Sequence, residues 1–230
     1  MYKYILLDID DTLLDFGKAE HQSIIGTFQQ FGIDPTDENI ERYSAINLSY
    51  WQRFERKEIT KDLLWSGRFM QLGDEIGQPI SEEEATKINA HYLFLLGNAA
   101  FPIDGSEEFL RTLISRGYHL YAITNGNEKV QHTRLEALSY KQYFKQLFIS
   151  EEIGYSKPDK EYFNHVMNAI GCLTTSEYLV IGDSLTSDIA GGNGIQIDTC
   201  WFNFRHKENR TGIQPTYTVE SYTDILKLLE

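Results

Sequence analysis

Acidic residues close together near the N-terminus are the first feature that could do chemistry. Asp8 and Asp10 follow an apolar run at residues 4–7, which predicts a strand buried on both faces. Because successive side chains of a strand point to opposite faces, Asp8 and Asp10 point to the same side. Two such carboxylates repel each other, and a hard divalent cation with oxygen ligands would relieve that repulsion. The alternative is an acidic turn in which Asp11 or Thr12 caps a following helix.

A second group of polar residues could bind phosphate. Thr124, Asn125 and Gly126 directly follow an apolar run at residues 120–123. A hydroxyl, an amide and the backbone N–H groups of a glycine-containing turn are suited to phosphate oxygens. Taken alone this group says little, because turns made of Asn-Gly are common.

A lysine and two further aspartates complete the set. Lys157 precedes Pro158, which is suited to the first turn of a helix, and its ammonium could neutralise a carboxylate or a phosphoryl group. The alternative is a solvated surface lysine. Asp183 follows the apolar run 178–181, and Asp188 comes about one helical turn later. Asp188 could hold Lys157 or a metal-bound water, or it could be a first-turn acid of the next helix.

The elements that must position these residues are strands alternating with helices. Helical periodicity at residues 106–116 and 159–170 lies between apolar runs that predict buried strands. This alternation predicts an α/β fold with a doubly wound parallel sheet, whose functional site lies beyond the carboxyl ends of the strands. All the polar groups above would then meet at one edge of the sheet. Each alternative given above is credible for one group by itself, but it is much less credible that all the groups meet at this edge by chance. The predicted strands are residues 4–7, 120–123, 147–149, 178–181 and 199–202.

One long stretch has helical periodicity and no convincing strand. It separates the first two predicted strands, so it should be a helical insertion above the strand ends. We therefore predict an α/β core domain of residues 1–16 and 99–230, and an inserted α-helical domain of residues 17–98. The four helices expected within the insertion are residues 19–31, 37–54, 61–73 and 81–96.

The bulk properties restrict the partners. A net charge of −13 repels polyanions, so we expect no nucleic-acid partner, although a local metal ion could still attract a small phosphorylated metabolite. Cys172 and Cys200 form no CxxC pair, which favours free thiols in a reducing cytoplasm. The apolar runs are too short for a signal peptide or a membrane span. We expect a cytoplasmic protein without a membrane partner, and we infer no protein partner.

The four motifs and their order resemble those of the haloacid dehalogenase superfamily, and the resemblance covers the whole chain. The resemblance implies that Asp8 is the nucleophile and Asp10 the general acid and base. It implies that magnesium, or manganese in its place, binds the side chains of Asp8 and Asp183 and the backbone carbonyl of Asp10.

The same resemblance assigns the remaining motif residues. Thr124 would bind the phosphoryl group, and Lys157 would stabilise the nucleophile and its phosphorylated form. From its place in the same turn, we expect Asn125 to bind the phosphate as well. Asp188 would provide support. The helical insertion resembles the family's cap of the first type, which is inserted between the first two motifs.

Three stretches, residues 8–16, 182–192 and 197–203, are similar to the pyrimidine 5′-nucleotidases of this superfamily. They imply a magnesium-dependent phosphomonoesterase that works through a phosphoaspartyl intermediate on (deoxy)pyrimidine nucleoside monophosphates. A sugar-phosphate phosphatase or phosphomutase on the same core is one alternative. A phospho-accepting signalling module without turnover is the alternative from another class. A dehalogenase is disfavoured, because that reaction would leave Asp10 and Asp183 without a role.

Overall fold

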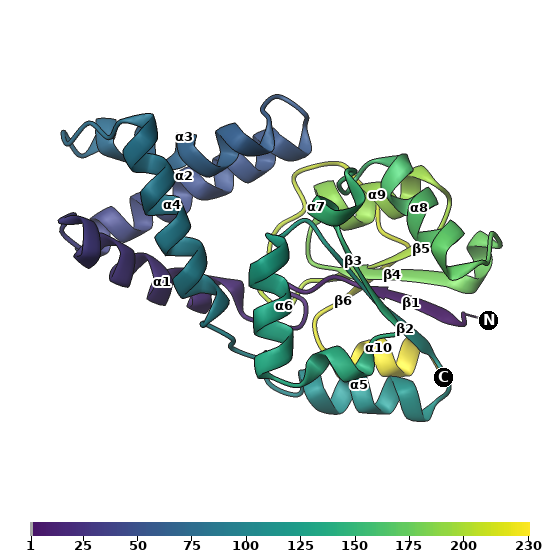
Figure 1. Ribbon diagram of the computed structural model, residues 1–230. Helices are drawn as coiled ribbons and strands as arrows, with labels where there is room; N and C mark the ends of the chain where they lie inside the picture. The colour runs from purple at the N-terminus through teal and green to yellow at the C-terminus, as the bar shows by residue number, and fades with distance from the viewer. Residues whose placement is uncertain (1) are drawn as a thin grey trace. The chain divides into compact units, whose positions relative to one another are not determined.

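The computed structural model describes residues 2–230, and the chain forms two compact units. One unit contains the chain up to Phe16 together with Ala100–Glu230, and the other is Gly17–Ala99. The first holds every strand, whereas the second is built only of helices (Figure 1). The assignment of these units as a core and a cap stays a prediction.

The sheet has six parallel strands in the order β3-β2-β1-β4-β5-β6. The central strand β1 is aligned so that Leu7 pairs with Ala122 of β2 and with Ile181 of β4. The residues that follow these three therefore lie at one edge of the sheet, as expected for parallel strands. The strands are β1 (Tyr4–Leu7), β2 (His119–Thr124), β3 (Gln146–Ile149), β4 (Tyr178–Gly182), β5 (Asp198–Phe202) and β6 (Tyr217–Val219).

Helices cover both faces of this sheet, which confirms the doubly wound α/β fold (Figure 1). One apolar cluster joins Ile5 and Leu7 to α5 and α10, and a second joins Leu6 to α8 on the opposite face. The strands are therefore buried on both sides, as their continuous apolar runs indicated. The helices of this unit are α5 (Ser106–Ser115), α6 (Glu128–Ala137), α7 (Ser150–Ile153), α8 (Lys160–Ile170), α9 (Ala190–Gly194) and α10 (Tyr222–Leu228).

Several elements differ from the sequence prediction. Strand β6 was missed because a run of three residues is too short to give a periodic signal. Helix α6 was missed because two of its four buried residues, Gln131 and Arg134, are polar. Pro158 does not lie in a helical turn as predicted: α8 begins at Lys160, and Asp159 is its N-cap.

The helical unit contains α1 (Phe16–Phe31), α2 (Asp37–Glu55), α3 (Lys61–Glu75) and α4 (Glu82–Gly97). Thr36, Thr60 and Ser81 cap the last three, each accepting a hydrogen bond from the backbone N–H three residues on. Its interior is partly polar, because the buried Arg68 donates to Asn47 and Asn89 at 2.6 and 2.7 Å. No helix among residues 2–230 is long and apolar enough to cross a membrane.

The contact between α8 and α9 gives a stability prediction. A Cβ atom at Gly191 would lie 2.2 Å from Cε2 of Phe163, whose ring is fully buried and cannot move aside. We expect Gly191→Ala to lower the free energy of unfolding by about 1–3 kcal/mol. The matched control is Gly194→Ala in the same helix, where the nearest atom would be 3.8 Å away. Urea denaturation of both variants measures the difference, and equal stabilities would contradict this packing.

Candidate active site

A buried ion pair lies at the carboxyl end of β1. Asp8 follows the last residue of the strand and is only 6% exposed. Lys157 Nζ donates to Asp8 Oδ1 at 2.7 Å, and Thr12 Oγ1 donates to Asp8 Oδ2 at 3.1 Å. Both oxygens of the carboxylate are therefore held, and a nearby positive charge is fixed on one of them.

The Lys157 ammonium connects three elements of the core. It also donates to Asp188 Oδ1 at 2.7 Å and to the carbonyl of Ile123 at 3.0 Å. Burial lowers the pKa of Lys157, but the Asp188 and Asp8 carboxylates outweigh burial and raise it above its ordinary value. The lysine is therefore charged at every physiological pH.

Asn125 positions this lysine. Its Nδ2 donates to the backbone carbonyl of Lys157 at 2.8 Å, and its Oδ1 accepts from the backbone N–H of Lys157 at 2.9 Å. This reciprocal pair joins the segment after β2 to the segment before α8. The side chain predicted to bind phosphate thus holds Lys157 in place.

Three carboxylates converge beside the ammonium. One oxygen from each of Asp8, Asp183 and Asp188 lies within 4.8 Å of the others. Burial raises the pKa of Asp8 well above its ordinary value, with Lys157 acting in the opposite direction. Burial also raises the pKa of Asp183 to about 7, although Lys207 lies 2.9 Å from its Oδ2. Three acids face the buried Lys157 and the half-exposed Lys207, which leaves an excess of negative charge, and hard oxygen ligands of this kind fit magnesium or manganese.

Asp10 lies in a different environment. Its carboxylate is not among those three; it accepts hydrogen bonds from Gln131 and Arg134 of α6. Thr124, at the end of β2, is hydrogen-bonded to the same Gln131. The structure thus brings Asp8, Asp183, Asp188 and Lys157 together, and it places Asp10 and Thr124 on a neighbouring polar network.

Three residues of the site were not identified from the sequence in these roles. Thr12 was considered only as a helix cap, although its place in the Asp-x-Asp-x-Thr motif could have indicated a contact with Asp8. Gln131 and Arg134 gave no such signal, because polar residues on a helix are usually solvated. Only the fold shows that they are fully buried.

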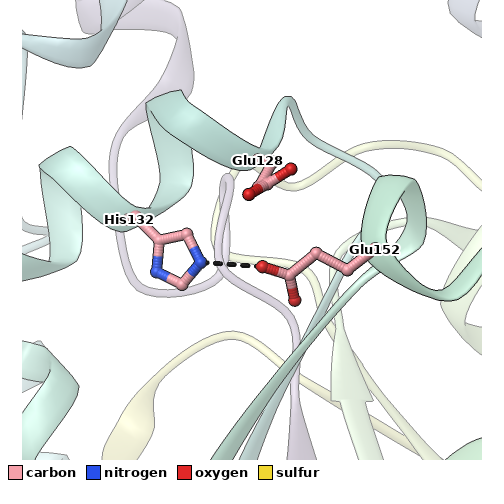
Figure 2. A group of neighbouring side chains, drawn as sticks. All are labelled: Glu128, His132 and Glu152. Carbon is pink, nitrogen blue, oxygen red and sulfur yellow. Dashed lines mark hydrogen bonds and ion pairs between the residues drawn. The ribbon is translucent and has the colours of Figure 1, made fainter.

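A second acidic group lies on α6 and α7. Glu128 and His132 are one helical turn apart, and His132 Nε2 lies 2.9 Å from Glu152 Oε1 (Figure 2). Glu128 is exposed, and the other two side chains are about one-third exposed. This arrangement is a contact between solvated surface side chains, and among residues 2–230 nothing further around it points to a ligand.

Comparison with known proteins identifies the family. The family model of haloacid dehalogenase-like hydrolases matches residues 2–195. The chain belongs to this family, and it is a hydrolase of phosphoric monoesters. The resemblance inferred from the four motifs is thereby confirmed.

Individual relatives match over nearly their full length. Pyrimidine 5′-nucleotidase PynA of Streptococcus pneumoniae is 38% identical over 229 residues, which is 100% of this chain and 95% of the relative. Pyrimidine 5′-nucleotidase YjjG of Escherichia coli is 31% identical over 228 residues, 99% of this chain and 98% of the relative. A crystal structure of the putative HAD-hydrolase YfnB from Bacillus subtilis, bound to magnesium and described as revealing interdomain movement, matches with a TM-score of 0.92 and 34% identity, covering 100% of this chain and 99% of that one.

Replacing Lys157, whose ammonium contacts two buried carboxylates, should destabilise the protein in the absence of a metal ion. In Lys157→Met, Asp8 and Asp188 face each other without a counter-charge, so we expect the free energy of unfolding at pH 8 to fall by about 3–5 kcal/mol. Lys157 lowers the pKa of Asp8, so its loss should raise that pKa further in the variant; proton uptake by Asp8 then favours folding of the variant more than of the parent, and the deficit should shrink as the pH falls towards 5. Denaturation in a chelating buffer measures both effects. The exposed Lys160→Met is the control, and a deficit independent of pH would contradict this account.

Magnesium binding should depend on pH. Because the pKa of Asp183 is about 7, a magnesium ion that binds this carboxylate must displace a proton at lower pH, and we expect the affinity to fall roughly fivefold from pH 7 to 6. Between pH 7 and 8 the ionised fraction of the carboxylate rises only from about one half to about nine-tenths, so the affinity should change less than about twofold. Isothermal titration calorimetry checks this, with Asp183→Asn as the variant that loses binding at every pH. Equal affinities at pH 6 and 8 would exclude a raised pKa.

Proposed function

We propose that this enzyme is a magnesium-dependent 5′-nucleotidase that hydrolyses pyrimidine nucleoside monophosphates through a phosphoaspartyl intermediate on Asp8. The observation that carries the proposal is the buried Asp8–Lys157–Asp188 chain at the carboxyl edge of the sheet, in a protein whose relatives PynA and YjjG are pyrimidine 5′-nucleotidases. A carboxylate that attacks phosphorus needs a fixed position and a nearby positive charge, and Lys157 provides both.

In the first step, an Asp8 oxygen forms a bond to phosphorus and the ester P–O bond breaks. Asp10 donates a proton to the departing alkoxide, which leaves as the nucleoside alcohol. In the second step, water attacks the phosphorus of the phosphoaspartate, Asp10 takes its proton, and the P–O bond to Asp8 breaks to release inorganic phosphate. Proton transfer of this kind contributes about 10²–10⁴-fold to the rate.

Lys157 and Thr124 support both steps. The Lys157 ammonium remains within hydrogen-bond reach of Asp8 and offsets the negative charge that accumulates during transfer. Thr124 donates its hydroxyl to a phosphoryl oxygen, while Asn125 serves the phosphate site by holding Lys157.

The side chains of Asp8 and Asp183 and the backbone carbonyl of Asp10 would hold magnesium, with Asp188 supporting the site through Lys157. When bound, the ion supplies positive charge that neutralises the phosphoryl oxygens. The excess of carboxylates over ammonium groups in this cluster is what such an ion would balance.

The helical unit, Gly17–Ala99, is proposed to be a cap that excludes water and selects the substrate. The interdomain movement described for YfnB supports a hinge between two such units. The free thiols of Cys172 and Cys200 agree with a cytoplasmic enzyme acting on a small phosphorylated metabolite.

The test is a panel of phosphomonoesters assayed with magnesium and with chelator. We expect pyrimidine nucleoside monophosphates to give the highest kcat/KM and the chelator to abolish turnover. Asp8→Asn should abolish turnover of every substrate, because it removes the nucleophile.

Sugar phosphates are the necessary comparison, because a glyceraldehyde 3-phosphate phosphatase of Pyrococcus abyssi is 25% identical over 242 aligned residues. Equal kcat/KM for triose or hexose phosphates would overturn the nucleotidase assignment. A single stoichiometric phosphorylation of Asp8 without turnover would instead support a signalling module.

A further inference from the structure

Two fully buried residues of α6 hold the Asp10 carboxylate. Gln131 Nε2 donates to Asp10 Oδ2 at 2.6 Å, and Arg134 Nη1 donates to Asp10 Oδ1 at 2.5 Å. They are three positions apart, so both side chains leave the same face of the helix. The Asp10 side chain itself is 27% exposed, so it has one side against these donors and another that solvent reaches.

Gln131 also fixes the hydroxyl group of Thr124. Its Nε2 donates to Thr124 Oγ1 at 2.9 Å, and the backbone N–H of Gly126 donates to the same oxygen at 3.0 Å. A hydroxyl has a single proton, and an oxygen that already accepts two hydrogen bonds must direct that proton to a third group. One amide therefore links the residue proposed to transfer protons with the residue proposed to bind the phosphoryl group.

The turn before α6 is shaped to admit this amide. A Cβ atom at Gly126 would lie 2.2 Å from Gln131 Nε2, so any larger residue would displace the side chain. Gly126 is thus required by the close approach of Gln131.

Burying Arg134 costs free energy, because two of its buried nitrogen atoms gain no hydrogen bond in return within the part of the chain that the structure describes. Its Nε and Nη2 have no hydrogen-bond partner among residues 2–230, and its side chain has no exposed surface. Replacing a buried ion pair as a whole, here Arg134 together with Asp10, by apolar residues of similar size is often neutral or stabilising. Stability alone therefore does not account for an arginine at this position.

We propose that Gln131 and Arg134 are positioning residues: they fix the Asp10 carboxylate for proton transfer to the leaving group, and Gln131 also orients the Thr124 hydroxyl. Each Asp10 oxygen accepts one of these bonds and retains a second lone pair for the proton. This inference rests on the proposed function, and it adds two residues to the machinery of that reaction.

The test compares two esters that differ in their need for a proton. A nucleoside monophosphate releases an alkoxide that must be protonated, whereas p-nitrophenyl phosphate releases a stable phenolate. With magnesium present, we expect Arg134→Met to lower kcat for the nucleotide about 10- to 100-fold with an unchanged KM. Its first-turnover release of nitrophenolate should change by less than about threefold, because that step needs no acid.

Gln131→Met should show the same selectivity and also raise KM for both esters, because Thr124 loses its orientation. Gly126→Ala should reproduce this pattern without removing the amide. Arg134→Lys should recover part of the nucleotide rate, since its ammonium can still donate a hydrogen bond to Asp10. The control is Lys129→Met on the exposed side of α6, which should behave as the parent enzyme.

Equal losses on the two esters, or no loss on the nucleotide, would overturn the inference. If Arg134→Met does not fold, as denaturation curves would show, Arg134→Lys and Gln131→Met decide the question by the same comparison. Asp10→Asn separates this inference from the proposed function. Full activity of Asp10→Asn would contradict the proposed mechanism itself. Loss of activity in Asp10→Asn, with full activity in the Gln131 and Arg134 variants, would contradict only the positioning role of these two residues.

Discussion

The buried ammonium of Lys157 is the interaction on which the site depends. It lies 2.7 Å from carboxylate oxygens of both Asp8 and Asp188, and all three side chains are almost completely shielded from solvent. Burial of an acid in such a place favours its neutral form, and a facing cation opposes that effect. The lysine lowers the pKa of Asp8 and so favours the ionised carboxylate that the proposed attack on phosphorus needs. The backbone of the lysine is in turn fixed by Asn125.

The parallel sheet supplies the rest of the geometry. Adjacent strands β2, β1 and β4 are parallel and end at the same edge of the sheet, so short segments from distant parts of the sequence deliver their polar residues to that edge. The strands themselves are buried on both faces by helices and provide a rigid support. The carboxylates at this edge outnumber the buried lysine, and the resulting charge imbalance is what makes the cluster suitable for a divalent ion.

Helix α6 shows how a polar helix face can serve a site. Most buried helix faces in this unit are apolar, as on α8, where Phe163, Val166 and Met167 face the sheet. On α6, Gln131 and Arg134 take inward positions and extend to Asp10 and Thr124. The helix therefore contributes hydrogen-bond donors where its neighbours contribute apolar surface.

The sequence by itself determined the alternation of strands and helices, because continuous apolar runs and helical periodicity are local patterns. It also determined which acids and which lysine follow the strand ends, and so the edge at which Asp8, Lys157 and Asp183 would meet. Only the tertiary structure decided that the Asn125 side chain holds Lys157 and that α6 turns polar residues inward. These contacts join residues far apart in the chain, and no local pattern distinguishes a buried glutamine or arginine from a solvated one.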